Sequence, residues 1–283
     1  MRIEVNGTRL WFDVDGAALV PEGPTMRARP TVVLLHGGPG SYDHSYFKPD
    51  FEPLTRVAQV IYLDLRDHGR SAWGDPAAWT FEVCADDVRA FCDALGIVRP
   101  IVLGHSMGGF VTMLYGARHP GHAAGLVLQS THARFDLERI VEGFRAVAGD
   151  EVAELARREY GHDPIDDDRW DRVFAAFGPR VPDTEQLARR IGNDDVDAGG
   201  ERFTEFDVVE QLSRIDCPTL VCVGSLDPVT PIDAAHEIVN ALPRGIGQLR
   251  VIEGVGHFPW IDAPERYWPV IEDFVSQVDP PAP

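Results

Sequence analysis

Two short motifs place a serine where nucleophilic catalysis requires it. Residues 104–108 read GHSMG, the G-x-S-x-G pattern in which a serine occupies a tight turn between a strand and a helix with its hydroxyl exposed. The glycines are needed because a Cβ at either position would crowd the turn. An apolar run precedes this motif and a helical pattern follows it, so we expect Ser106 to be a nucleophile.

The second expected component is a base with its carboxylate partner. Asp227 stands in GSLDP at residues 224–228, and His257 stands in GVGHF at residues 254–258. Each motif follows an apolar run. The chain order Ser, Asp, His is that of α/β sheets whose serine is activated by a histidine held by an aspartate. The sequence therefore predicts that His257 takes the proton from Ser106 and that Asp227 orients His257.

An oxyanion loop is predicted at residues 36–40, which read HGGPG directly after an apolar run. Glycines allow the backbone N–H of Gly38 to point at a developing oxyanion, beside the N–H of Met107 at the start of a helix. His36 lies at the strand end, and we expect it to brace this loop. The polar run 64–71 also follows a strand and is expected to stabilise the neighbouring turn.

The elements that position these motifs alternate along the chain. Short Val/Ile/Leu runs are typical of parallel strands covered by helices on both faces. They span residues 31–35, 59–63, 101–103, 125–128, 219–223 and 248–252. Helical patterns fall between them at residues 80–96, 107–118, 231–242 and 264–278, and residues 3–14 read as a hairpin about Asn6-Gly7. The predicted fold class is α/β, with a doubly wound sheet.

One stretch breaks the alternation and predicts an inserted helical cap. We expect a core formed by residues 1–132 and 208–283, with a cap over residues 133–207 whose helices cover residues 137–148, 152–160, 168–177 and 184–191. The cap is acidic, with Glu138, Glu142, Asp150 and Glu154 among its carboxylates. Phe258 and Trp260, which follow the predicted base, are expected to line a moderately apolar substrate pocket with Met107.

Composition excludes several classes of function. The 283 residues carry a formal net charge of −19, which argues against nucleic acid as a partner because phosphate contacts need a basic face. No apolar leader or spanning stretch is present, so we expect a cytoplasmic protein without a membrane partner. The four cysteines lack metal-site spacing, and Asp166–Asp168 lacks the glycine and closing glutamate of a calcium loop. No metal or organic cofactor is expected, and the sequence leaves the oligomeric state open.

These motifs, in this order, resemble the α/β-hydrolase superfamily over essentially the whole chain. The resemblance implies an eight-stranded, mostly parallel sheet with a lid over the active site. HGGPG is similar to the oxyanion loop of the proline iminopeptidase branch, which removes N-terminal proline from small peptides and uses lid carboxylates to bind the free amine. The resemblance assigns the triad to Ser106, Asp227 and His257, and the oxyanion donors to Gly38 and Met107.

Several functions share this set of residues. A small-molecule or short-peptide substrate is expected, either a prolyl amide or the ester or lactone of a carboxylesterase or lactonase. The chain has Met107 where typical proline iminopeptidases have tryptophan. Carbon–carbon bond hydrolases and perhydrolases also keep the triad, whereas epoxide hydrolases and haloalkane dehalogenases need a carboxylate in place of Ser106. A non-catalytic receptor of the same fold is the remaining alternative, although such a protein is expected to have lost a triad member.

Overall fold

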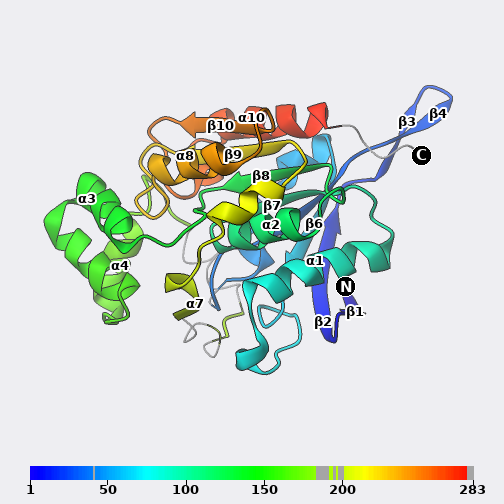
Figure 1. The fold of residues 1–283 in the computed structure, drawn as a ribbon. Coiled ribbons are helices and arrows are strands. Elements are labelled where there is room, and N and C mark those ends of the chain that lie inside the picture. The colour runs from blue at the N-terminus through cyan, green and yellow to red at the C-terminus, as the bar shows by residue number, and fades with distance from the viewer. Residues whose placement is uncertain (41, 183–190, 194–195, 197–200, 279–283) are drawn as a thin grey trace.

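An eight-stranded sheet forms the centre of the molecule (Figure 1). The computed structural model describes residues 1–40, 42–182, 191–193, 196 and 201–278. The spatial order of the strands is β1 (Arg2–Val5), β2 (Thr8–Asp15), β6 (Gln59–Asp64), β5 (Thr31–Leu35), β7 (Ile101–His105), β8 (Gly125–Gln129), β9 (Thr219–Gly224) and β10 (Gly247–Ile252). Strands β6 to β10 and β5 pair in parallel, and β1 and β2 pair antiparallel. The predicted fold class and the mostly parallel sheet are confirmed.

The hairpin at the N-terminus forms because its turn residues tolerate positive φ. Asn6 and Gly7 have φ of 47° and 73°, the backbone that a two-residue hairpin turn requires. The central strands β5 and β7 to β9 are buried almost throughout. Their continuous apolar runs therefore pack against helices on both faces.

Helices cover both faces of the sheet (Figure 1). Helices α1 (Phe81–Leu95), α2 (Met107–Arg118) and α8 (Ile232–Ala241) contribute to the core on one face, and α10 (Pro264–Gln277) contributes to the core on the other. Helix α1 begins and ends as predicted, because the Thr80 hydroxyl accepts from the Val83 N–H and Gly96 adopts the left-handed conformation with φ of 66°.

The segment between β8 and β9 is helical and extends beyond the end of the sheet (Figure 1). Helix α3 (Leu137–Tyr160) joins the two helices expected at 137–148 and 152–160, with a break in helical geometry at Gly149. It is followed by α4 (Asp167–Ala175), capped by the Asp166 side chain, and later by α7 (Glu201–Thr204). The helix expected at 184–191 lies almost wholly outside the described residues. Below, cap denotes residues 133–207.

Short elements complete the fold. The 3₁₀ helices are η1 (His44–Phe47), η2 (Glu52–Arg56), η3 (Pro76–Ala78) and η4 (Val209–Arg214), and α9 (Pro259–Asp262) precedes α10. Strands β3 (Leu19–Glu22) and β4 (Thr25–Ala28) form a hairpin that projects from the body and that the sequence patterns did not predict (Figure 1). Among the described helices, none combines the length and the apolar character needed to cross a bilayer.

Candidate active site

The predicted nucleophile lies on a strained turn between β7 and α2. Ser106 has φ of 53° and ψ of −119°, a backbone region that a non-glycine residue occupies at a cost of about 1–3 kcal/mol. A Cβ on Gly104 would lie 2.1 Å from the Gly108 carbonyl oxygen, and one on Gly108 would lie 2.2 Å from the Leu35 carbonyl oxygen. Both glycines are therefore required for the turn to close against β5.

The predicted base and its carboxylate are hydrogen-bonded to each other. His257 Nδ1 donates to Asp227 Oδ2 at 2.9 Å, and both side chains are buried. Asp227 also accepts from the Val229 and Thr230 N–H groups and from the Thr230 hydroxyl. These bonds fix the carboxylate, so the His257 tautomer carries its proton on Nδ1 and leaves Nε2 free to accept one.

The oxyanion loop contacts the nucleophile turn. A Cβ on Gly37 would lie 3.4 Å from the Ser106 Cβ, and one on Gly38 would lie 3.1 Å from the Met107 Cε. Gly38 has φ of +150°. Met107 is the first residue of α2, where N–H groups lack partners within the helix. Within the described chain neither of these two N–H groups donates a recorded hydrogen bond, which leaves both available to a substrate oxygen.

Tyr46 and His105, two buried side chains that the sequence reasoning missed, connect the oxyanion loop to the loop of His257. The Gly37 N–H donates to the Tyr46 hydroxyl at 2.9 Å, and that hydroxyl donates to His105 Nδ1 at 2.8 Å. His105 Nε2 in turn donates to the His257 carbonyl oxygen at 3.0 Å. The directions follow from the last bond, because a carbonyl oxygen can only accept: Nε2 of His105 therefore carries the proton, and Nδ1 of the neutral ring accepts from the Tyr46 hydroxyl. We call this chain of hydrogen bonds the Tyr46–His105 relay.

The relay keeps a neutral histidine beside the predicted base. The rings of His105 and His257 lie 4.7 Å apart. Burial, with a contribution from His257, lowers the pKa of His105 well below its ordinary value. A neutral His105 does not repel the positive charge that His257 acquires when it takes a proton.

Buried histidines also brace the oxyanion loop. His36 donates from Nδ1 to the Gly37 carbonyl oxygen and accepts at Nε2 from the Leu65 N–H. The Gly40 N–H donates to His68 Nε2. Burial lowers the pKa of both histidines, to about 3 for His68. These bonds agree with the bracing role expected of His36 and extend it to the loop at 64–71.

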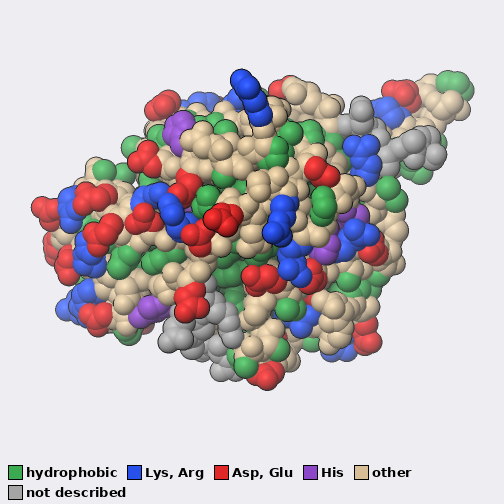
Figure 2. Space-filling view, in the orientation of Figure 1, with side chains coloured by type: hydrophobic (Ala, Val, Ile, Leu, Met, Phe, Trp, Pro, Cys, Tyr) green, Lys and Arg blue, Asp and Glu red, His purple; other side chains and the backbone are tan. Residues whose placement is uncertain are grey.

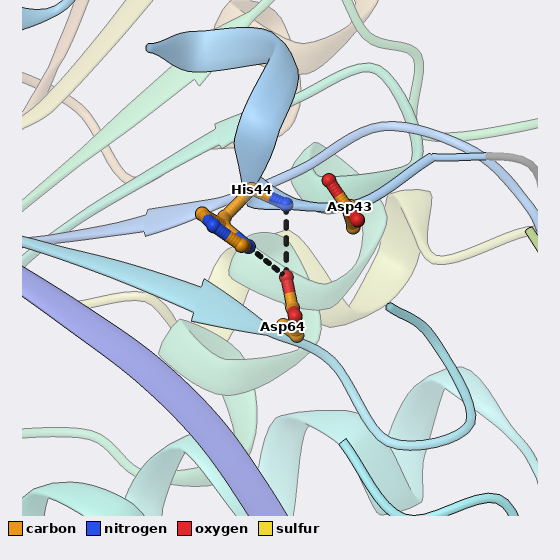
Figure 3. A group of neighbouring side chains, drawn as sticks. All are labelled: Asp43, His44 and Asp64. Atoms are coloured by element: carbon orange, nitrogen blue, oxygen red, sulfur yellow. Dashed lines mark hydrogen bonds and ion pairs between the residues drawn. The ribbon is translucent and has the colours of Figure 1, made fainter. Parts of the chain in front are cut away.

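A cluster with the composition of a metal site lies near this loop, but its ligand atoms are already bonded (Figure 3). Asp64 Oδ1 accepts from both the N–H and the Nδ1 of His44, and Asp64 Oδ2 accepts from the Arg70 N–H. Asp43 accepts from the N–H groups of Ser45 and Ile191. A metal ion would have to displace these bonds. We therefore interpret the cluster as a hydrogen-bonding network that holds residues 43–45 against residues 64–70.

The cap contacts the loops that carry the predicted base and its carboxylate. In α3, a Cβ on Gly143 would lie 2.3 Å from the carbonyl oxygen of Pro228, next to Asp227. The Phe177 carbonyl oxygen accepts from the His257 N–H at 2.6 Å. The cap is therefore in direct contact with both loops.

A third cap contact reaches the oxyanion loop. The Asn193 N–H donates to the Gly40 carbonyl oxygen at 3.0 Å, and the Asn193 side-chain amide donates to the Asp67 carbonyl oxygen at 2.8 Å. Asn193 is buried. The position of the cap is thereby tied to the geometry of the loop that carries Gly38.

The two residues predicted to line the pocket lie in different places. Phe258 packs between His257 and the cap aromatics Phe174 and Phe177. Trp260 packs instead against His105, with Tyr46 and other core aromatics around it. Trp260 also borders a surface groove of about 980 Å³, and none of Ser106, Asp227 and His257 lines that groove. Phe258 therefore packs between the predicted base and the cap, whereas Trp260 packs against His105 behind the nucleophile turn.

The four cap carboxylates singled out from the sequence are engaged at the surface. Glu138 pairs with Arg157, Glu142 and Asp150 pair with Arg145, and Glu154 lies 3.9 Å from Arg157. Their side chains are all more than 60% exposed. Acidic and basic side chains intermingle over the surface where α3 and α4 lie, at the left of Figure 2. None of these four is placed to bind a substrate amine inside the site.

Comparison with known proteins gives a consistent picture. The family model described as alpha/beta hydrolase fold matches residues 30–264. A putative carbamate hydrolase from Pseudomonas syringae is 29% identical over 87% of this chain and 94% of its own length. A proline iminopeptidase from Lactobacillus helveticus is 25% identical over 89% of this chain and 91% of its own length.

Solved structures extend the likeness to the three-dimensional fold. A thermophilic esterase from Thermogutta terrifontis is 27% identical, with a TM-score of 0.72 over 98% of this chain and 99% of the esterase. A proline iminopeptidase from Mycobacterium smegmatis has a TM-score of 0.77 at 21% identity, covering 98% and 97% of the two chains. These four relatives are named as hydrolases, and their names give different types of substrate.

Proposed function

This chain belongs to the α/β-hydrolase fold family, and on that premise we propose that it is a serine hydrolase that forms an acyl-enzyme on Ser106. The observation that carries the proposal is the joint placement of Ser106 on its strained turn and of His257 bonded to Asp227, at the carboxyl ends of β7, β10 and β9. Such a placement is the site geometry of serine catalysis on this type of sheet.

The proposed reaction follows from these groups. Ser106 Oγ attacks the substrate carbonyl carbon while His257 Nε2 takes the hydroxyl proton, and the N–H groups of Gly38 and Met107 stabilise the resulting oxyanion. His257 then returns the proton to the leaving alcohol or amine as its bond to the carbonyl carbon breaks. Water, activated by the same histidine, releases the acid and regenerates the Ser106 hydroxyl.

The substrate is proposed to be a small ester or amide. The HGGPG loop and relatives named proline iminopeptidase favour a free-amine prolyl substrate. The surface pairing of Glu138, Glu142, Asp150 and Glu154 favours the alternative, an esterase or lactonase that shares the loop, because these carboxylates do not face the site. Both alternatives use the same triad and differ in what the pocket recognises.

Kinetics on a matched panel test the proposal. Wild type and Ser106→Ala are compared on prolyl, alanyl and leucyl aryl amides and on short p-nitrophenyl esters, with circular dichroism as the check on folding. We expect the alanine variant to keep its fold and to lose nearly all turnover. Equal turnover by both proteins would refute the assignment of Ser106.

The same panel separates the two substrate classes. A preference for prolyl amide that disappears when the substrate amine is acetylated supports an aminopeptidase. Ester turnover without amide cleavage supports the esterase or lactonase. No turnover by wild type, together with no labelling of Ser106 by a fluorophosphonate, supports a receptor.

A further inference from the structure

A histidine at the start of the cap lacks the hydrogen bond that its burial demands. His132 follows β8 by three residues and is 7% exposed. Its Nε2 atom is fully buried and has no hydrogen-bond partner among the described residues. An unpaired buried polar atom costs free energy that the fold does not recover. We therefore expect a molecule that binds the protein to supply the missing hydrogen bond.

The position of His132 points to the substrate as that partner. The adjacent Thr131 hydroxyl donates to the Ser106 carbonyl oxygen at 2.8 Å, and the Ser106 N–H donates to the Gln129 carbonyl oxygen at 3.0 Å. Gln129 and Thr131, which precede His132, are thus bonded to the nucleophile turn. We call residues 129–132 the cap-entry segment.

Aromatic rings pack against the His132 ring. The ring lies 4.7 Å from Phe110 of α2, which stacks on Phe206 at the other end of the cap at 4.3 Å. Both phenylalanines are buried. These neighbours offer no hydrogen bond, so His132 supplies polarity to an aromatic surface close to Ser106.

Electrostatics fixes what kind of group His132 can recognise. Burial, aided by the charge of Arg139, lowers the pKa of His132 to about 3, while Asp227 acts in the opposite direction. The ring is therefore neutral near pH 7, with one nitrogen that donates and one that accepts. A neutral hydroxyl or amide group satisfies either nitrogen, whereas a purely hydrocarbon substrate leaves Nε2 unpaired.

We propose that His132 is a specificity-determining residue that hydrogen-bonds a neutral hydroxyl or amide group of the substrate, next to the ester or amide bond that Ser106 attacks. The inference rests on the proposed serine hydrolase function. It deepens that function by assigning the site to substrates with a second polar group rather than to simple alkyl esters. Sites that hydrogen-bond a substrate group discriminate strongly against the analogue that lacks it.

The test compares matched substrates on three proteins: wild type, His132→Phe and His132→Gln. Acyl pairs are the p-nitrophenyl esters of butyrate with 3-hydroxybutyrate and of pentanoate with N-acetylglycine. An alcohol pair is butyl acetate with 3-hydroxypropyl acetate. For each pair, the selectivity is kcat/KM for the polar member divided by kcat/KM for the apolar member.

We expect the selectivity for at least one pair to fall about tenfold in His132→Phe, the loss of one buried hydrogen bond. His132→Gln, whose amide reaches the position of Nε2, is expected to restore most of it. Without substrate, the melting temperature of His132→Phe is expected to equal or exceed that of wild type, because an unpaired polar atom has been removed. His122→Phe is the control: His122 is bonded to the Tyr115 hydroxyl, so its loss is expected to destabilise the fold and leave selectivity unchanged.

Selectivity unchanged in His132→Phe for every pair would overturn the proposal, and His132 would then bind only buried water. A lower melting temperature with equal losses on all substrates would also overturn it, since that result marks a packing role. Fluorophosphonate labelling of Ser106 in all three proteins separates these outcomes from failure of the proposed function. If labelling is absent from wild type, Ser106 is not the nucleophile. If labelling is intact and selectivity does not change, only the role of His132 is wrong.

Discussion

Two buried polar regions flank Ser106 and differ in how their side chains are bonded. In the Tyr46–His105 relay, the tyrosine hydroxyl and both ring nitrogens of His105 have hydrogen-bond partners within the protein, from the Gly37 N–H to the His257 carbonyl oxygen. In the cap-entry segment, Gln129 Nε2, Ser130 Oγ and His132 Nε2 are all buried without a partner among the residues that the structure describes. A group that must hold a fixed geometry is expected to be satisfied before substrate arrives, whereas a group that recognises substrate is completed only when it binds. We therefore expect the relay to position the site and His132 to recognise the substrate.

The largest effect on activity is expected at the hydrogen bond between Asp227 and His257. Asp227→Asn keeps an oxygen that can accept from the Val229 and Thr230 N–H groups, yet its amide no longer stabilises a positively charged His257. We expect kcat to fall by a factor of roughly 10³–10⁴, with the fold intact. Steady-state kinetics with a thermal melt as control measures this. A loss of tenfold or less would mean that Asp227 is not the partner of the base.

Removing the hydroxyl of Tyr46 tests whether the relay positions the site. Tyr46→Phe leaves the Gly37 N–H and His105 Nδ1 unpaired, so the oxyanion loop and the loop of His257 lose their link. We expect kcat to fall roughly 10- to 100-fold with KM little changed.

The matched control for Tyr46→Phe is Tyr115→Phe. Its hydroxyl also bonds a histidine, but it lies in α2 nine residues beyond Ser106, about 13 Å away along the helix. Each variant is expected to lose about 1–3 kcal/mol of unfolding free energy in urea titrations. Equal kcat for the two variants would reduce the relay to a stabilising network.

A smaller effect is expected where the cap meets the loop of Asp227. Gly143→Ala places a Cβ 2.3 Å from the Pro228 carbonyl oxygen, so α3 must move away from that loop. We expect a loss of about 1–3 kcal/mol in unfolding free energy. Because the cap contacts the loops that carry Asp227 and His257, KM is expected to rise severalfold while fluorophosphonate labelling of Ser106 continues. A change in labelling rate as large as that in KM would contradict a separation between positioning and recognition.

The smallest effect for any single residue is the pH dependence of stability. Burial lowers the folded-state pKa of His36, His68, His105 and His132 below the ordinary value of 6.5. Their stabilising contribution is complete above pH 6.5 and is lost as the pH falls toward the folded-state pKa, because the unfolded chain then binds more protons. For His68 and His132, whose folded-state pKa is about 3, we expect urea titrations between pH 7 and pH 5 to show a loss of about 1 kcal/mol per pH unit each.

His132→Phe sharpens that measurement. The variant lacks one of the four histidines, so its unfolding free energy is expected to fall less steeply between pH 7 and pH 5, by about 1 kcal/mol per pH unit. A slope that is flat in wild type, or that does not change in the variant, would show that these rings are not held neutral in the folded state.

The parts of the site that the sequence predicts are those governed by local geometry. The glycines around Ser106 and in HGGPG are demanded by contacts within a few residues or with the adjacent strand, so their spacing alone indicates the turn. The apolar runs that precede Asp227 and His257 likewise reveal strand ends. The helix boundaries at Thr80 and Gly96 follow from capping chemistry that lies within the adjacent turn of sequence.

The remaining features depend on contacts between distant parts of the chain. Tyr46 reaches His105 across 59 residues, and nothing in the sequence near either residue marks that bond. Trp260 follows His257 closely but faces the core, because α9 turns the chain back toward Tyr46. The absence of a partner for His132 is a property of the packed structure and has no sequence signature.

The central claim is that Ser106 becomes acylated, and a direct test is the mass of the protein trapped during turnover. Wild type, Ser106→Ala and His257→Ala are mixed with a p-nitrophenyl ester, quenched in acid and digested for mass spectrometry. The account predicts that an acyl adduct appears on the peptide containing Ser106 in wild type and is absent from Ser106→Ala and strongly reduced in His257→Ala. An adduct on another residue, or turnover by wild type with equal product release from Ser106→Ala, would contradict it.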